Sequence, residues 1–236
     1  MSELTGEARA RYVRRMFGRI APRYDLLNRW MTFGLDRGWR AELVRRMDLA
    51  PAARVLDVGA GTGDLALEVL KRQPAARLVA LDFTPEMMSL GRRRPGGERV
   101  HWVVADAAQL PFPDRAFDGA VSGFLLRNVP DIDRVLSEER RVLRPGGCVA
   151  SLDTTPPPRS WLRPLIRFHL HTVIPLLGRI VAGEPEAYTY LPQSTERFVD
   201  AGSLAERMTA AGFRGVEFAR RMLGTIALHW GARPTD

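Results

Sequence analysis

The sequence lacks several features that mark secreted, metal-binding or membrane-spanning proteins. Cys148 is the only cysteine, so no internal disulfide can form, which suits a cytoplasmic protein. No apolar run is long enough to cross a bilayer, and no signal-peptide pattern opens the chain. His169 and His171 have no third ligand beside them, so we expect no metal. These absences together predict a metal-free cytoplasmic protein.

Lysine is almost absent as well. Lys71 is the single lysine among 35 Lys and Arg residues, and the formal net charge is +8. An excess of arginine favours a negatively charged partner, either nucleic acid or an anionic membrane surface. The sequence does not interleave aromatic with basic residues as a single-strand-binding groove does, so we expect a membrane contact and no nucleic acid. At 236 residues, one domain with a substantial core is the simplest organisation.

A run of glycines is the most informative feature that the sequence does have. Residues 55–63 read V-L-D-V-G-A-G-T-G, and residues 64–70 continue with helical spacing. This pattern predicts a strand, a tight glycine turn and a helix, which together bring a cofactor against bare backbone. Dinucleotides and S-adenosylmethionine (SAM) both bind such a turn.

The spacing of the glycines separates these two cofactors. Gly59, Gly61 and Gly63 form G-x-G-x-G, whereas the dinucleotide fingerprint is G-x-G-x-x-G. A carboxylate at Asp57 would repel a pyrophosphate held on helix amides, but it suits the cationic methionine end of SAM, as does Asp64. An NAD-dependent oxidoreductase is therefore the disfavoured alternative.

Acids that follow the next two strands point to SAM as well. Asp82 ends the second expected strand and can accept both ribose hydroxyls, while the Phe83 ring can pack on an adenine. Asp106 follows the third expected strand and can accept from the adenine amine, with neighbouring backbone amides donating to the ring. A lone Asp after a strand is usually a turn former. Three acids at the ends of three consecutive strands favour a SAM site.

The alternation of strands and helices from residue 54 predicts an α/β fold with a doubly wound, mostly parallel sheet. Strands are expected at 54–58, 77–82, 100–104, 117–122, 148–153, 214–221 and 224–230, with helices at 63–72, 85–93, 131–142 and 203–211. A sheet that closes with a C-terminal antiparallel hairpin is typical of the Rossmann-like class I SAM-dependent methyltransferases. We expect one domain over residues 1–236, comprising an N-terminal helical lid (1–50), a cofactor-binding core (51–155), a helical substrate-side insertion (156–200), and a closing helix and hairpin (201–236).

Two segments outside the core have two interpretations each. Residues 7–20 predict a basic amphipathic helix with Tyr12, Met16 and Ile20 on one face. It either packs on the domain with solvated arginines, or acts as a lid or a contact with anionic lipid. The insertion mixes apolar residues with arginines, so it is either an ordinary capping element or a pocket cover at a membrane interface.

Further segments, in this order and spacing, resemble the C-methyltransferases of menaquinone and ubiquinone biosynthesis. The glycine run and the R-V-L-R-P-G-G turn are shared by many methyltransferases, and three of the other segments are far more specific. The segments are R-Y-D-L-L-N at 23–28, F-G at 33–34, Trp39, L-R-N-V at 126–129, the turn at 141–147, Y-T-Y-L-P-Q-S at 188–194 and L-H at 228–229. The resemblance runs from about residue 14 to 231, with departures at Asp36, Gly123 and Asp153, where the family has His, Ser and Glu.

The resemblance implies methyl transfer from SAM to a ring carbon of a prenylated quinol such as demethylmenaquinol. The alternative acceptor is another small aromatic or a lipid. Peripheral contact with the inner face of the cytoplasmic membrane and a homodimer are further expectations. The expected cofactor-binding residues are Asp57, Gly59, Gly61, Thr62, Gly63, Asp82, Phe83, Asp106, Ala107, Ser122 and Tyr24, the last of which would close over the cofactor.

Arg127 and Asn128 are the expected catalytic residues, and the resemblance places both in the substrate pocket. A guanidinium stays charged, so Arg127 would stabilise a phenolate or orient a water and would not act as a bare base. Asn128 would fix a ring oxygen. Without the resemblance, both would be taken for capping or ion-pair residues. His229 is a candidate general base, although a strand histidine is more often structural.

Overall fold

The computed structural model of the chain describes residues 6–157, 161, 163–168, 172–173, 176 and 194–235. The strands are β1 (Arg54–Val58), β2 (Arg77–Asp82), β3 (Val100–Val104), β4 (Phe117–Gly123), β5 (Leu143–Thr154), β6 (Arg214–Arg221) and β7 (Ile226–Ala232). The helices are α1 (Gly6–Met31), α2 (Asp36–Arg46), α3 (Asp64–Arg72), α4 (Pro85–Arg92), α5 (Ile132–Val142), α6 (Arg163–Phe168) and α9 (Ala201–Ala210).

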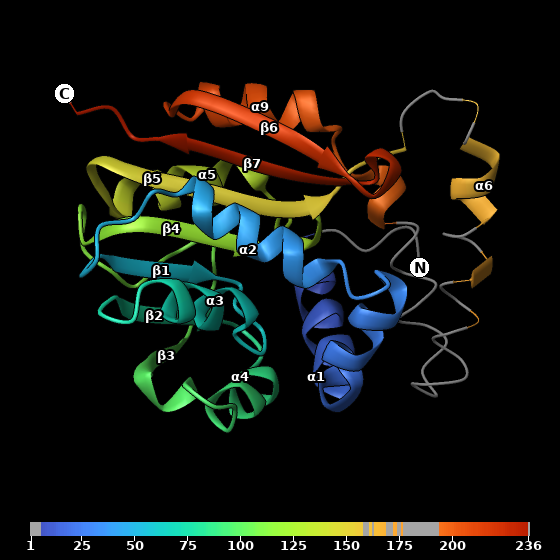
Figure 1. The fold of residues 1–236 in the computed structure, drawn as a ribbon, viewed down its shortest axis with the longest axis horizontal. Coiled ribbons are helices and arrows are strands. Elements are labelled where there is room, and N and C mark those ends of the chain that lie inside the picture. The colour runs from blue at the N-terminus through green and yellow to red at the C-terminus, as the bar shows by residue number, and fades with distance from the viewer. Residues whose placement is uncertain are drawn as a thin grey trace.

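The strands form one sheet in the order β3-β2-β1-β4-β5-β7-β6. Neighbours from β3 to β5 are parallel, and β7 lies antiparallel between β5 and β6. This confirms the predicted Rossmann-like α/β fold with its closing antiparallel hairpin. The carboxyl ends of the parallel strands point toward α1 (Figure 1). Ligands of such sheets bind outside these ends, so α1 stands at the edge where a cofactor site is expected.

Helices cover both faces of the sheet because each presents an apolar side to it. On one face, α2 and α3 contribute Leu43, Leu65 and Val69 to a core with Trp102 of β3. On the other, α5 and α9 contribute residues such as Leu136 and Leu204 to a second core. The start of α5 is fixed by Asp131, whose side chain accepts a hydrogen bond from the Arg134 amide at 3.0 Å. The two apolar layers hold the strand ends in place.

Two elements are longer than the sequence predicted. Helix α1 continues past residue 20 to Met31, straight through Pro22. Met16 and Ile20 are buried as predicted, whereas the side chain of Tyr12 lies outside the described part. Strand β5 begins at Leu143, which pairs with Phe117, but pairing with β4 resumes only at Cys148, and Gly146 has a left-handed φ of 77°. The predicted turn at 144–147 is therefore present as an irregularity within β5, whereas in α1 packing outweighs the local preference of proline.

The insertion expected at 156–200 is described in part, as α6, a few separate residues and 194–200. His169, His171 and residues 188–193 of the Y-T-Y-L-P-Q-S segment lie outside the described residues. Among the helices that are described, none combines the length and the apolarity needed to span a membrane.

One acid lies inside the apolar layer beneath α5. Glu139 is fully buried, and the nearby Ser122 hydroxyl lowers its pKa a little. Neither carboxyl oxygen has a hydrogen bond of normal geometry among the described residues. Burial therefore dominates and raises the pKa of Glu139 to about 8. The side chain is protonated in the folded protein at neutral pH.

Glu139→Gln should change how stability depends on pH. The folded pKa of Glu139 lies above its ordinary value of 4.5, so this carboxyl favours folding fully below about pH 4.5, and that contribution is lost as the pH rises through about 8. The loss approaches ~1.4 kcal/mol per pH unit. Glutamine does not ionise, so urea unfolding from pH 5 to pH 8 should show the variant gaining stability relative to the parent. A difference that stays constant with pH, or an equal gain in Glu138→Gln, would contradict the burial argument.

Candidate cofactor and substrate site

The glycine turn joins β1 to α3 at the carboxyl edge of the sheet. Gly59, Gly61 and Gly63 have φ values of 68°, 56° and 80°, in the left-handed region that favours glycine. A Cβ on Gly59 would lie 2.6 Å from Cδ1 of Leu125, so a side chain there would also clash. The turn therefore presents bare backbone to the space beside it, as predicted from the spacing.

Two adjoining hollows lie against this turn. One, of about 360 Å³, is lined by the turn together with Asp57, Asp64 and Phe124. The other, of about 400 Å³, is lined by the turn, Asp82, Phe83, Asn128 and residues of α1. Gly59, Gly61 and Phe124 belong to both linings. Predicted cofactor residues from two strand ends are thus brought together around one space.

Asp57 lines the first hollow and has a carboxylate oxygen that can accept a further hydrogen bond. Its Oδ2 accepts a hydrogen bond from the Ala66 amide at 2.9 Å, while its buried Oδ1 has no hydrogen-bond partner among the described residues. Burial raises the pKa of Asp57 to about 7, and the nearby Asp82 and Asp64 add to the effect. A cation in this hollow would both satisfy Oδ1 and relieve the repulsion. These features fit the positively charged end of SAM.

Asp82 is fixed at the second hollow by backbone amides. Its Oδ2 accepts from Gly61 and its Oδ1 from Thr84, each at 2.8 Å. Burial raises the pKa of Asp82, while these hydrogen bonds lower it. Phe83 lines the same hollow. An oriented carboxylate beside an aromatic ring suits a ribose and its base.

Asp64 has a different role from the one expected. Its carboxylate lies 3.0 Å from Nη2 of Arg40 and 2.7 Å from Nη1 of Arg94. Burial alone would raise the pKa of Asp64, but the two guanidinium groups outweigh it and hold the pKa below its usual value. Asp64 is therefore already neutralised by the protein. Neither arginine was among the predicted site residues, because nothing local in the sequence ties them to Asp64.

Helix α1 covers the turn through a second set of contacts. The Thr62 hydroxyl donates to Oδ1 of Asp25 at 2.7 Å, and Arg94 donates to the Thr62 carbonyl at 3.0 Å. Phe17 and Val13 of α1 line the second hollow. Asp25 belongs to the R-Y-D-L-L-N segment, so this segment has a structural purpose in attaching α1 to the cofactor turn. The side chain of Tyr24 lies outside the described side chains.

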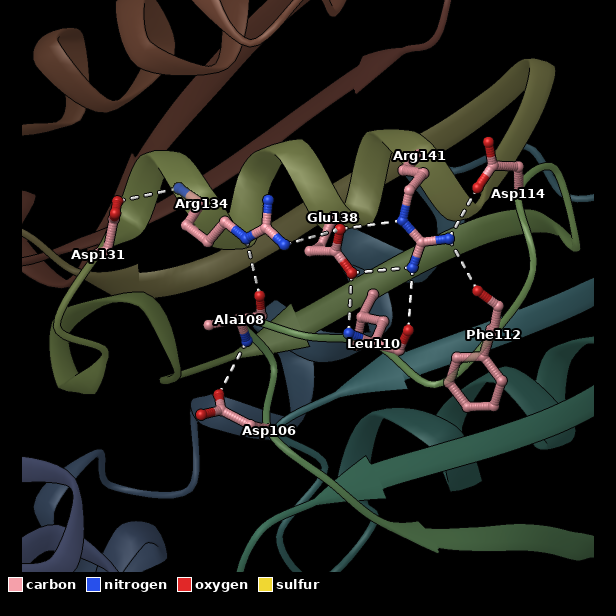
Figure 2. Close-up of polar contacts among 9 residues, drawn as sticks. All are labelled: Asp106, Ala108, Leu110, Phe112, Asp114, Asp131, Arg134, Glu138 and Arg141. Atoms are coloured by element: carbon pink, nitrogen blue, oxygen red, sulfur yellow. Dashed lines mark hydrogen bonds and ion pairs between the residues drawn. The ribbon is translucent and has the colours of Figure 1, made fainter. Parts of the chain in front are cut away.

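Four predicted cofactor residues line neither hollow: Gly63, which completes the turn, and Ser122, Asp106 and Ala107. Ser122 lies beneath α5 beside Glu139, on the opposite face of the sheet from α3. Asp106 is exposed, and its Oδ1 accepts from the Ala108 amide at 2.8 Å, as turn-forming acids do (Figure 2). Ala107 is buried in the core under α5. Side chains alternate between the two faces along a strand, so the position of Ser122 in β4 decides which face it is on. A shift of one residue would place it on the opposite face.

The loop that carries Asp106 is bound to α5. Glu138 accepts from the Leu110 amide at 2.9 Å, and Arg141 donates to the carbonyls of Leu110 and Phe112 at 2.9 and 2.8 Å (Figure 2). Arg141 is also hydrogen-bonded to Glu138, and this contact lowers the pKa of Glu138. The turn motif at 141–147 therefore begins with a residue that holds the loop between β3 and β4 in place.

The two predicted catalytic residues lie on the short helix η2 (Leu126–Asn128), and both contact Phe124, which precedes it. Arg127 is buried, with Nη1 2.6 Å from Oδ1 of Asp153 and its guanidinium 5.0 Å from the Phe124 ring centroid. Asn128 donates from Nδ2 to the Phe124 carbonyl at 2.9 Å and lines the second hollow. Sequence reasoning noted Asp153 as a departure from the family but missed it as the partner of Arg127.

His229 is placed for a structural role. Its Nε2 lies 2.9 Å from the carbonyl of Ala201, which makes Nε2 the donor, and its ring stacks on Phe218. Burial lowers the pKa of His229, so the ring is neutral. It lines neither hollow. These contacts suit a hydrogen-bonded core histidine better than a general base.

Comparison with known proteins identifies the family of the chain. Residues 5–233 match the ubiE/COQ5 methyltransferase family. The chain belongs to this family. It is 43% identical over 221 residues to the ubiquinone/menaquinone biosynthesis C-methyltransferase UbiE of Desulfotalea psychrophila, covering 94% of this chain and 90% of that one. It is also 43% identical over 222 residues to the demethylmenaquinone methyltransferase of Thermus thermophilus, covering 93% of this chain and 100% of that one.

Solved structures support the fold. A SAM-dependent methyltransferase from Thermotoga maritima superposes with a TM-score of 0.65 at 19% identity, covering 93% of this chain and 99% of that one. At this identity the likeness concerns the fold alone. Family membership makes the protein a methyltransferase.

Asp25→Ala and Thr62→Val should each weaken SAM binding, because each removes the hydrogen bond that attaches α1 to the glycine turn. A hydrogen bond to a charged group contributes about 1.5–3 kcal/mol, so we expect a rise in Kd of about tenfold or more for each single variant. The double variant should bind no worse than Asp25→Ala alone, since Asp25→Ala already removes this contact together with the ion pair to Arg94. Isothermal titration calorimetry measures these affinities, with Thr209→Val as the control hydroxyl deletion. Additive losses would mean that Asp25 and Thr62 act separately.

Proposed function

We propose that this protein transfers a methyl group from SAM to a ring carbon of a prenylated quinol, with demethylmenaquinol as the acceptor. The observation that carries the proposal is Asp57, a buried acid with an unused oxygen that faces a glycine turn in a chain of the ubiE/COQ5 family. The names of the relatives, which are similar along almost their whole length, support the acceptor.

In this proposal the two hollows hold the two ends of SAM. Asp57 accepts from the amino group, Asp82 accepts from the ribose hydroxyls, and Phe83 packs against the adenine. Thr62, between the hollows and α1, keeps the turn closed over the ligand. When bound, SAM supplies an electrophilic methyl group. The chain has to hold the acceptor ring in line with that group and exclude water.

The quinol ring becomes a strong carbon nucleophile once one of its hydroxyls loses a proton. The guanidinium of Arg127 stabilises the resulting phenolate, while Asn128 hydrogen-bonds a ring oxygen. Asp153 orients Arg127 through the buried ion pair. Holding the ring carbon in place contributes up to ~7–11 kcal/mol of the rate acceleration. Arg127 therefore acts by charge and position. Transfer of the methyl group would leave S-adenosylhomocysteine, and the ring becomes aromatic again when the methylated carbon loses its proton to solvent and the phenolate regains its own.

The prenyl tail gives the substrate a second constraint. A long apolar tail keeps the quinol in a bilayer, so the protein meets its substrate at a membrane surface. We accordingly propose that it works as a peripheral protein on the inner face of the cytoplasmic membrane. The net charge of +8 favours such a surface when it carries anionic lipids.

A methyl-transfer assay with isotope-labelled SAM tests the acceptor. Chemically reduced demethylmenaquinone with a short prenyl tail should take label on the ring carbon, and the oxidised quinone should not, because it lacks the electron-donating hydroxyl. A reduced naphthol without a tail serves as the control acceptor. Label on unrelated phenols with none on the quinol would overturn the proposal and favour another small aromatic or lipid acceptor.

Arg127 and Asp153 should be tested as a pair. Arg127→Ala leaves Asp153 as an isolated buried charge, which costs about 3–5 kcal/mol of stability and confuses activity with folding. The double variant Arg127→Gln, Asp153→Asn keeps neutral hydrogen-bonding groups in both places. We expect it to fold, to bind SAM with a Kd close to that of the parent, and to lose at least 100-fold in kcat, an order-of-magnitude expectation for removing an electrostatic stabiliser. A normal kcat would assign Arg127 a purely structural role.

A further inference from the structure

The outward side of α1 has a composition that the cofactor site does not explain. Its exposed residues at helical spacing are Arg15, Arg19, Arg23, Leu26, Arg29 and Trp30, which we call the outer face of α1. Residues spaced by three and four share one side of a helix. The basic residues come first along the helix and the apolar ones last. The opposite side of the same helix is buried against the domain, through Met16, Ile20 and Leu27.

The turn after α1 extends this face with further apolar side chains. Phe33 is 74% exposed and Leu35 is 52% exposed, beside Trp30 at 54% and Leu26 at 47%. Arg37 follows them and is exposed too. We name the outer face of α1 together with residues 33–37 the docking face. Large apolar side chains grouped in this way mark interaction sites, whereas scattered ones do not.

The charges of this stretch have one sign at the surface. Every described charged side chain that is exposed between residues 13 and 38 is an arginine. The two acids of the stretch point inward, Asp25 to Thr62 and Asp36 to a buried ion pair with Arg40. A partner that fits this face therefore offers negative charge around an apolar interior.

The backbone accepts strain to present Phe33. The amides of Phe33 and Gly34 donate to the carbonyls of Trp30 and Arg29, at 3.3 and 2.7 Å, which is the Schellman pattern at a helix end. Glycine is the usual residue at the left-handed position of that pattern, yet Phe33 occupies it with a φ of 53°. The left-handed backbone thus presents an aromatic side chain that is mostly exposed to solvent.

We propose that the docking face binds an anionic bilayer surface, with Trp30 and Phe33 at headgroup level and the arginines at lipid phosphates. An amphipathic helix with a basic polar side and aromatic residues on its apolar side binds membranes in this way. A second copy of the chain fits less well, because a two-fold contact would set this face against itself and bring arginine against arginine. Anionic lipid supplies the complementary charge.

This placement serves the site that α1 covers. Val13 and Phe17 on the inner side line the second hollow, and a helix with its side chains is about 10 Å across. Docking through the outer side thus holds the hollow within about one helix diameter of the lipid. The inference rests on the proposed function only for the identity of the substrate, because binding to lipid is measured without quinol or SAM.

Sedimentation of the full chain with large vesicles tests the docking face. The parent protein should bind vesicles of phosphatidylcholine and phosphatidylglycerol, and binding should fall as salt is raised. Phe33→Gly should weaken the partition coefficient about tenfold, as expected for an apolar side chain removed from the interface, while its Tm stays equal or rises because the left-handed position is relieved. Arg29→Glu should weaken binding at least about fivefold, and only on anionic vesicles.

Matched controls separate the docking face from general effects. Leu223 is also exposed with a φ of 54°, but it lies in the turn between β6 and β7, at the end of the strand order away from α4, the helix that α1 contacts, so Leu223→Gly should leave vesicle binding unchanged. Arg77→Glu makes the same charge change at the amino edge of the sheet and should cost much less than Arg29→Glu. Equal binding by Phe33→Gly and the parent would overturn the proposal. So would a Phe33→Gly protein that changes from dimer to monomer in light scattering, which would assign the face to a second copy.

The proposed function and this inference fail in different ways. Phe33→Gly should keep the parent kcat with a water-soluble quinol acceptor, since Phe33 does not line the hollows, and lose activity only with a long-tailed quinol embedded in vesicles. If the parent protein binds anionic vesicles but transfers no label to the quinol, the docking face is supported and the proposed acceptor is rejected.

Discussion

The site depends on how the carboxylate of Asp64 is neutralised. Arg40 reaches it from α2 and Arg94 from the segment after α4, while Arg94 also contacts Asp25 of α1. One ionic cluster therefore attaches α1, α2 and the segment after α4 to the start of α3. An ion pair of this kind contributes little at a surface but holds its partners firmly when partly buried, since removing one charge leaves the other without compensation. The position of α1 over the glycine turn follows from this cluster.

Neutralising Asp64 leaves Asp57 as the acid that can respond to a ligand. Asp57 and Asp82 lie close enough for each to disfavour the charge of the other, and burial adds to that effect. The protein thus keeps a carboxyl with an elevated pKa and an unused oxygen at the hollow. A cation that enters the hollow stabilises the charged form of Asp57 and also gives its Oδ1 a hydrogen-bond donor. Perturbed groups of this type gather at functional sites because the strain is relieved only on binding.

Local patterns predicted most of the fold, because a buried parallel strand and its helix are short and periodic. The strands β1, β2 and β3 have the predicted bounds, and the glycine turn adopts the predicted conformation. The sequence could not predict contacts between distant segments. Arg40 and Arg94 meet Asp64 only in the folded chain, and Asp153 meets Arg127 across 26 residues. Ser122 faces α5 because of strand register, which a single unaligned sequence constrains weakly.

Phe124 connects the two halves of the site. It lines both hollows, has a left-handed φ of 58°, and lies within 5.8 Å of the Arg40 guanidinium and 5.0 Å of that of Arg127. A bulky residue in this conformation costs free energy that other contacts must offset. Here the Phe124 amide donates to the Leu152 carbonyl of β5, and its carbonyl accepts from Asn128. The ring thereby lies between the arginine of the ionic cluster and the arginine assigned to the acceptor. One aromatic side chain therefore contacts both the ionic cluster that holds α1 and the buried pair of Arg127 and Asp153.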